Sequence, residues 1–87
     1  MNRADNNQNE IVRGLRKCGA SVHILSQVGN GCPDLAVGFR GENFFLEVKE
    51  PGGMLRPTQL KWHQAWNGQV AVVHDFEEAW RAINKTL

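Results

Sequence analysis

The feature that most constrains this chain is a pair of apolar segments, residues 34–39 and 44–49, separated by a short polar turn at residues 40–43. Two such segments around a turn predict a β-hairpin. Side chains alternate between the two faces of a strand, so each segment has one strictly apolar face. That face carries Leu35, Val37, Phe39, Phe44, Leu46 and Val48, and the opposite face carries Asp34, Ala36, Gly38, Phe45, Glu47 and Lys49.

The pairing register of the hairpin decides which polar side chains meet. A turn of two residues, Gly41-Glu42, or of four, residues 40–43, places Asp34 opposite Lys49. Asp34 and Glu47 then become diagonal neighbours on one face, roughly 7–8 Å apart at the backbone, which is close enough to share an ion. A three-residue turn would shift the register, so this inference depends on the loop.

Two carboxylates and a lysine on a half-buried strand face need a physical reason, because burying an unpaired charge is costly. One interpretation is a salt bridge between Lys49 and Asp34, with Glu47 pointing to solvent. The other is a metal site, which the small neighbours Ala36 and Gly38 would leave accessible. A site made only of oxygen ligands suits Mg²⁺ or Mn²⁺ rather than zinc.

The remaining pattern predicts a small α/β domain with the element order αβββαβα. Asp5 is a candidate N-cap with Gln8 three positions later, Gly19 is a suitable residue just past the helix end, and Pro57 suits a first helical turn. The expected helices cover residues 6–18, 57–67 and 76–85, and the expected strands cover 21–28, 34–39, 44–49 and 69–74. With 87 residues, the chain has room for one domain, residues 1–87.

Composition narrows the class of protein. The net charge of +1 and a pI of about 7.9 permit a polyanionic partner without requiring one, since dedicated nucleic-acid binders usually exceed a pI of about 9. No apolar run approaches a membrane span, and the first residues lack the apolar stretch of a secretory signal. Cys18 and Cys32 form no CxxC pair. We therefore expect a cytoplasmic protein with reduced thiols and no membrane association.

Several motifs together resemble a known nuclease family. Pro33-Asp34 followed by Glu47-Val48-Lys49 is similar to the PD-(D/E)XK signature. The wider ordered set resembles the stand-alone form of the virus-type replication-repair nuclease (VRR-Nuc) domain over about residues 8–75. That set consists of Glu10, Gly31-Cys32-Pro33-Asp34, Leu46-Glu47-Val48-Lys49 and the segment Pro57-Thr58-Gln59-Leu60-Lys61-Trp62. The resemblance implies a restriction-endonuclease-like core, αβββαβ on a central mixed sheet, with the last helix as an extension.

The resemblance also implies roles for individual residues. Asp34 and Glu47 would be metal ligands, with the backbone carbonyl of Val48 as a third. Glu10 would be a further ligand, directly or through water, unless it is only an acid favoured near a helix N-terminus. Lys49 would orient the attacking water or stabilise charge on phosphorus. The implied cofactor is Mg²⁺, with Mn²⁺ as a substitute.

Other residues have weaker assignments. Gln59 would bind a phosphate or the water, or be a solvated polar residue of a first helical turn. The tryptophans of the same helix, Trp62 and Trp66, are expected in the core or an interface rather than stacked on bases. The candidate DNA-binding residues are Arg56 and Lys61, which flank the expected site, and Arg13 and Lys17 on the polar face of the first helix, where solvation is the alternative.

Taken together, the sequence predicts a metal-dependent, structure-specific DNA endonuclease of phage or bacterial type. A four-way (Holliday) junction resolvase is the favoured form, acting as a homodimer because junction resolution needs two symmetric nicks. The alternatives are a nuclease for flaps or other branched DNA, a nucleic-acid-binding module that does not cut, and an unrelated α/β interaction domain in which the motif is accidental.

Overall fold

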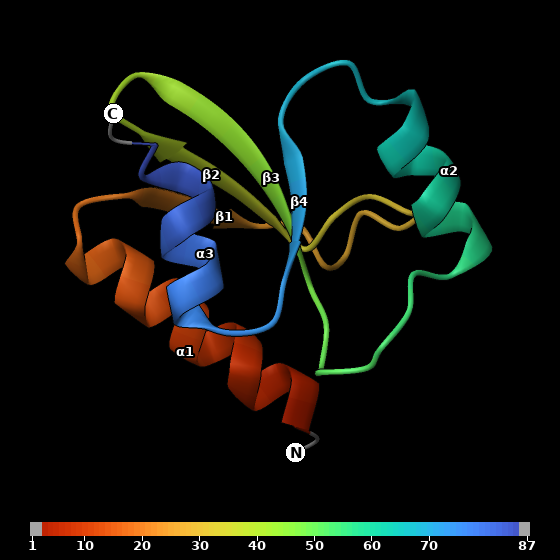
Figure 1. Cartoon of the computed structure of the whole chain (residues 1–87), viewed down its shortest axis with the longest axis horizontal. Coiled ribbons are helices and arrows are strands. Elements are labelled where there is room, and N and C mark those ends of the chain that lie inside the picture. The colour runs from red at the N-terminus through yellow and green to blue at the C-terminus, as the bar shows by residue number, and fades with distance from the viewer. Residues whose placement is uncertain (1–2, 86–87) are drawn as a thin grey trace.

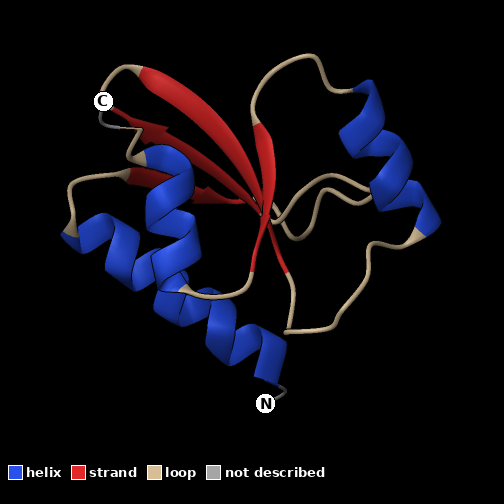
Figure 2. Cartoon of the chain, viewed as in Figure 1, coloured by secondary structure: helices blue, strands red, loops and turns tan. Residues whose placement is uncertain are grey.

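The computed structural model describes residues 3–85 and contains every element that the sequence predicts, in the predicted order (Figure 2). The helices are α1 (Arg3–Lys17), α2 (Pro57–Ala65) and α3 (Phe76–Ile83). The strands are β1 (Ser21–Ile24), β2 (Leu35–Phe39), β3 (Glu42–Val48) and β4 (Val70–Val73).

The four strands form one mixed sheet in the order β1-β2-β3-β4. β1, β2 and β3 pair antiparallel, whereas β4 lies parallel to β3. The parallel pair requires a crossover connection, and α2 supplies it. In Figure 1, α1 and α3 lie on one side of the sheet and α2 lies on the other.

The core lies between the sheet and the helix pair α1 and α3. The strictly apolar face of the hairpin packs here, as the alternation predicts, against the buried side of α1. The buried apolar residues are Ile11, Val12, Leu15, Ala20, Leu35, Val37, Phe44, Leu46, Val48, Val73, Ala79 and Ile83. The opposite face of the sheet is therefore free to carry polar chemistry.

The ends of α1 differ in how well the sequence predicts them. The helix begins at Arg3, so position 5 is already helical and the predicted N-cap at Asp5 is wrong. The side chain of Asp5 lies outside the described part of the structure. At the other end, Gly19 has a φ of 95°, and its N–H bonds the Arg16 carbonyl while the Ala20 N–H bonds the Leu15 carbonyl. These two bonds form a Schellman motif, so the predicted role of Gly19 is confirmed.

The predicted hairpin register is wrong by two residues. The turn is Arg40-Gly41, with φ values of 53° and 80°, and it pairs Phe39 with Glu42. Two consecutive positive φ angles define a type I′ turn, whose twist matches that of the flanking strands. Glycine suits its second position, which Gly41 occupies, whereas Gly41 would be first in the predicted two-residue turn, Gly41-Glu42. A shift of two residues leaves every side chain on its predicted face.

Some element ends are shorter than predicted. β1 ends at Ile24 rather than at residue 28, and residues 25–34 form the loop that leads to β2. α2 ends at Ala65 rather than at residue 67, because Trp66 has extended backbone angles. At the end of α1, Cys18 is exposed, whereas Val12 is buried on the side of the helix that faces the sheet.

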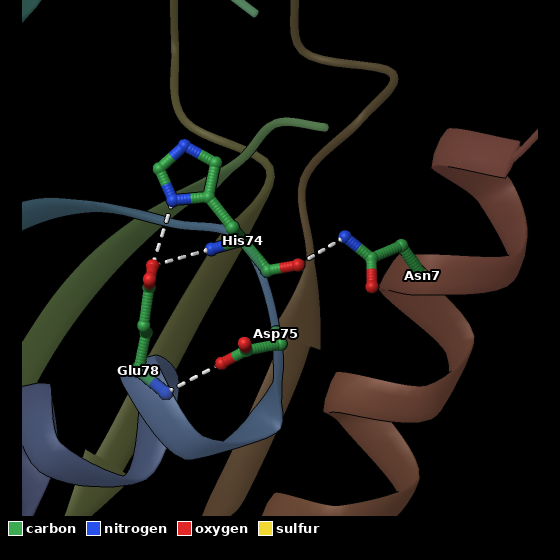
Figure 3. A network of polar contacts seen from close by, with 4 residues as sticks. All are labelled: Asn7, His74, Asp75 and Glu78. Carbon is green, nitrogen blue, oxygen red and sulfur yellow. Dashed lines mark hydrogen bonds and ion pairs between the residues drawn. The ribbon is translucent and has the colours of Figure 1, made fainter. Parts of the chain in front are cut away.

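A polar network joins α1 to the end of β4 and the start of α3 (Figure 3). The Asn7 side-chain amide donates to the His74 carbonyl at 2.5 Å. The Glu78 carboxylate accepts from the backbone N–H of His74 at 2.9 Å and lies 2.7 Å from its Nδ1. Asp75 caps α3 by accepting from the Glu78 N–H at 2.8 Å. Within residues 3–85, no helix is long and apolar enough to cross a membrane.

Candidate active site

The hairpin register brings Asp34 level with Glu47. Leu35 pairs with Leu46, so the next pair in the same register is Asp34 and Glu47, directly opposite rather than diagonal. The backbone carbonyl of Asp34 accepts from the Leu25 N–H at 2.7 Å, and its Oδ2 accepts from the Val48 N–H at 2.8 Å. Asp34 is therefore held between two strands, and the predicted pairing of Asp34 opposite Lys49 is wrong.

Glu47 is a buried carboxylate, with only 2% of its surface exposed. The salt-bridge interpretation, in which Glu47 points to solvent, is therefore wrong. Its Oε2 accepts from Gln59 Nε2 at 3.4 Å, while Oε1 is buried with no hydrogen-bond partner among the described residues. Burial raises the pKa of Glu47 from an ordinary value of 4.5 to about 8, and the neighbouring Asp34 adds to the rise. The charges of Lys49 and Arg56 oppose it.

Gln59 points its amide at Glu47 because the other end of that amide is already bound. The N–H of Arg56, just before α2, donates to Gln59 Oε1 at 2.8 Å. A side-chain amide has one accepting end and one donating end, so this bond turns the NH₂ group toward Glu47. The first turn of α2 thus contributes a donor to the carboxylate pair.

The loop before Asp34 positions this first turn of α2. Gly29, Asn30 and Gly31 all have positive φ angles, of 78°, 57° and 82°. A Cβ atom on Gly31 would lie 2.3 Å from the Thr58 carbonyl oxygen, so the two backbones touch and only glycine fits. The glycine-rich loop therefore determines the distance between Gln59 and Glu47.

These residues line a cleft of about 380 Å³, called here the carboxylate cleft. Its lining is polar and includes two cationic side chains beside the carboxylates. The residues are Gln8, Ser26, Asp34, Glu47, Val48, Lys49, Glu50, Gly53, Met54, Arg56 and Gln59. The cleft therefore brings together six predicted site residues, namely Asp34, Glu47, Val48, Lys49, Arg56 and Gln59.

Oxygen donors in this cleft fit a hard divalent cation. The buried Oε1 of Glu47 has no partner, and a carboxylate in this position is costly unless a cation or a proton neutralises it. Asp34 lies beside it, and Val48, whose carbonyl is the predicted third ligand, lines the same cleft. No group of three or more His, Cys, Asp and Glu residues suited to a metal was found among the described residues. Mg²⁺ suits such a sparse set because it usually keeps several waters.

Glu10 does not line the carboxylate cleft. It lines a neighbouring cleft, called here the acidic cleft, which shares Glu50 with the first. The acidic cleft is lined by Asn6, Asn7, Glu10, Glu50, Pro51, His74 and Asp75. From α1, the carboxylate cleft instead receives Gln8, whose Oε1 accepts from Ser26 Oγ at 3.5 Å.

Gln8 and Ser26 are cleft residues that the sequence analysis did not identify. A signal for Gln8 was present: it precedes Ile11, Val12 and Leu15 by three, four and seven positions, so it lies on the buried side of α1. Ser26 had no such signal, because it lies in a loop whose sequence resembles a continuation of β1.

The other predicted residues lie outside the carboxylate cleft. Lys61 is exposed on α2, while Arg13 and Lys17 line a separate groove on α1. Trp62 is half-buried and stacks on Trp66, with ring centroids 4.6 Å apart, and both rings meet the edge of Phe45. This small aromatic cluster attaches α2 to the sheet, outside the main core.

The cleft also changes the acidity of two neighbours. Burial raises the pKa of the Cys32 thiol, and the charges of Glu47 and Asp34 raise it further. Burial lowers the pKa of His63, and Lys49 lowers it further. The Cys32 thiol is therefore kept protonated, and the His63 imidazole is kept neutral.

Comparison with known proteins identifies the fold. No family model matches the sequence, and no curated protein matches it significantly. Among solved structures, a protein described as a "VRR_NUC domain" matches over 100% of both chains with a TM-score of 0.81 and 28% sequence identity. The whole chain thus has a nuclease-type fold, and the predicted fold class is confirmed.

The contact between Gly31 and Thr58 yields a first prediction. Gly31→Ala should destabilise the protein more than Gly29→Ala, and it should displace α2. Both positions have nearly equal positive φ angles, so the conformational strain of about 1–2 kcal/mol is shared. However, a Cβ on Gly29 meets no atom within 4 Å. Urea unfolding gives the stabilities, and tryptophan fluorescence reports the position of α2. Equal losses in the two variants would contradict the positioning role of Gly31.

The raised pKa of Glu47 yields a second prediction, for protein without divalent metal. The folded state binds the Glu47 proton more tightly than the unfolded state, so protonation of Glu47 stabilises the fold. This contribution to stability is complete below about pH 4.5. It is lost as the pH rises through about 8. Glu47→Gln, which cannot ionise, should therefore melt several degrees above wild type at pH 9 in EDTA, since 1 kcal/mol corresponds to about 4–8 °C here. Parallel melting curves from pH 5 to 9 would contradict the raised pKa.

Proposed function

Since the chain is a VRR-Nuc domain by fold, we propose that it is a metal-dependent endonuclease that hydrolyses phosphodiester bonds in branched DNA. The observation that carries this proposal is the buried Glu47 carboxylate, which lies beside Asp34 in a cleft that also contains Lys49. A purely structural role would not account for a buried carboxylate oxygen without a partner.

Asp34 and Glu47 would hold the divalent ion, with the carbonyl of Val48 as a third ligand. When bound, Mg²⁺ or Mn²⁺ would polarise the scissile phosphate and make water a better nucleophile. Glu47 must lose its proton before it can bind the ion. Metal binding should therefore release a proton and strengthen as the pH rises. Glu10 would act from the acidic cleft and could reach this site only through water.

Lys49 and Arg56 supply the positive charge that the anionic substrate needs. Both lie in the carboxylate cleft, and both lower the pKa of Glu47 through their charge. Lys49 would orient the attacking water or stabilise charge on phosphorus. Gln59, held by the Arg56 N–H, would keep the Glu47 carboxylate in place or contact a phosphate oxygen. Lys61, exposed on α2, would contact the DNA backbone beyond the cleft.

A homodimer that cuts four-way junctions is the finer form of the proposal. The accessible surface is 5838 Å², whereas a monomer of 9.8 kDa is expected to expose roughly 5,200 Å². A mostly apolar groove crosses the uncovered sheet face between β1 and Trp66, whose side chain is 43% exposed. A second copy packed on this face would bury that excess surface and supply a second cleft for the opposite strand. The alternatives are a flap or other branched-DNA nuclease and a DNA-binding module that does not cut.

A third prediction tests the catalytic assignment. Asp34→Asn, Glu47→Gln and Lys49→Ala should each reduce cleavage by at least 100-fold, the loss that typically follows removal of one preorganised charged group. The first two should also weaken Mn²⁺ binding. Glu77→Gln removes a carboxylate from an exposed pair with Arg81, outside the cleft, and is the matched control. The assay is cleavage of labelled DNA with Mg²⁺, with Mn²⁺ and with EDTA. Wild-type rates in any of the three variants would contradict the assignment.

A fourth prediction tests assembly and substrate. Light scattering at micromolar concentration should give the mass of two chains, and a four-way junction labelled on two strands should be nicked symmetrically. Flap, splayed and duplex DNA serve as comparison substrates. A monomer that cuts flaps and leaves junctions whole would overturn the junction assignment and favour the flap alternative.

A further inference from the structure

A groove of about 490 Å³ lies between α1 and β1, the strand at one edge of the sheet. Three of the six residues that line it are basic, and none is acidic. They are Asn9, Val12, Arg13, Arg16, Lys17 and Ile24, and the groove is called here the basic groove. It is distinct from the carboxylate cleft, with which it shares no residue.

The basic groove contrasts with the acidic cleft, which also borders α1. The acidic cleft is lined by Glu10, Glu50 and Asp75 and contains no lysine or arginine. The net charge of +1 therefore hides a division of charge between two neighbouring surfaces along one helix. A polyanion would be attracted to the basic groove and repelled from the acidic cleft.

Two elements run directly from the basic groove to the carboxylate cleft. On α1, Asn9 lines the groove and the adjacent Gln8 lines the cleft. After β1, Ile24 lines the groove, and Ser26, two residues later, lines the cleft. Gln8 and Ser26 are bonded to each other, so the groove begins where the cleft ends.

The length of the groove matches a short stretch of DNA. Lys17 is nine residues from Gln8 on α1, which corresponds to about 14 Å at 1.5 Å per residue. At 3.4 Å per base pair, this is roughly four base pairs of duplex. Arg16 is held at the groove by donating to the Val22 carbonyl at 3.0 Å.

Helix stability alone does not explain this cluster. Arg16 and Lys17 lie in the last turn of α1, where positive charge favours the helix dipole. Arg13 lies before that turn and gains little from the dipole. The apolar side chain of Ile24 is 46% exposed beside these charges, and DNA sugars would cover it.

We propose that the basic groove binds the sugar–phosphate backbone of a DNA arm, up to about four base pairs from the phosphate that is cleaved. This inference rests on the proposed function, because the carboxylate cleft sets the origin from which the arm is measured. In this arrangement α1 positions the DNA arm, and the carboxylate cleft carries out the hydrolysis.

The test compares Arg13→Ala/Lys17→Ala with Arg81→Ala/Lys85→Ala, which removes the same charge from the region of α3. Both double variants carry Glu47→Gln, so that branched DNA is bound and not cut. Binding is measured by fluorescence anisotropy with Mg²⁺ at several salt concentrations. The groove variant should bind at least about 10-fold more weakly, and its log–log salt slope should fall by about two units. The control variant should keep both the affinity and the slope of its parent.

A second measurement locates the contact on the DNA. Neutral methylphosphonate linkages are placed one at a time along one arm, one to eight nucleotides from the cleaved phosphate. Substitutions up to about four nucleotides away should weaken binding by the parent protein and leave the groove variant unaffected. Melting temperatures confirm that the variants are folded.

The outcomes separate this inference from the proposed function. If the groove variant and the control lose affinity and slope equally, or if the neutral linkages have equal effects on both, the groove assignment is overturned while cleavage stands. If the wild-type protein neither binds nor cuts any branched DNA, the proposed function itself fails. With Glu47 restored, the groove variant should show a raised KM and an unchanged kcat, because the groove does not touch the reacting phosphate.

Discussion

The site depends on one buried carboxylate, Glu47, that the fold holds between Asp34 and Gln59. Ionising a carboxyl group at 2% exposure is unfavourable, and burial and Asp34 together raise its pKa to about 8. The protein without metal therefore holds a proton where the proposed function requires a cation. Each surrounding element contributes to this arrangement. Asp34 is the residue just before β2, the glycine-rich loop packs against the first turn of α2, and α2 carries Gln59.

Such a site is possible because the two faces of the sheet have separate tasks. α1 and α3 cover one face and bury the main core there, so stability does not require the other face to be apolar (Figure 1). α2 covers only part of that second face, through Trp62 and Trp66 on Phe45. Glu47 lies beyond this aromatic cluster on the same strand, β3. A substitution in this aromatic cluster would therefore disturb the site more than the main core.

The sequence predicted the elements and the strand faces because both follow from local periodicity. The faces survived the register error, since a shift of two residues preserves alternation. The register itself depends on the twist of a two-residue turn, and Arg40 at a positive φ gave no strong signal, because arginine is not typical of that position. The site residues Asp34, Glu47, Lys49 and Gln59 were found through a motif. Ser26 was not found, because its place depends on where β1 ends, and this is decided by tertiary contacts of the loop.

The helix α1 shows how one element can serve three surfaces. Positions 8, 9 and 10 point in directions about 100° apart, so Gln8 lines the carboxylate cleft, Asn9 the basic groove and Glu10 the acidic cleft. A motif that records only the presence of a glutamate in this helix does not distinguish these directions. Glu10 therefore faces the acidic cleft, which borders the basic groove along α1, since Arg13 and Lys17 follow Glu10 by three and seven positions. Its charge would disfavour DNA over the acidic cleft, so that an arm leaving the carboxylate cleft is favoured on the neighbouring path, along Arg13 and Lys17.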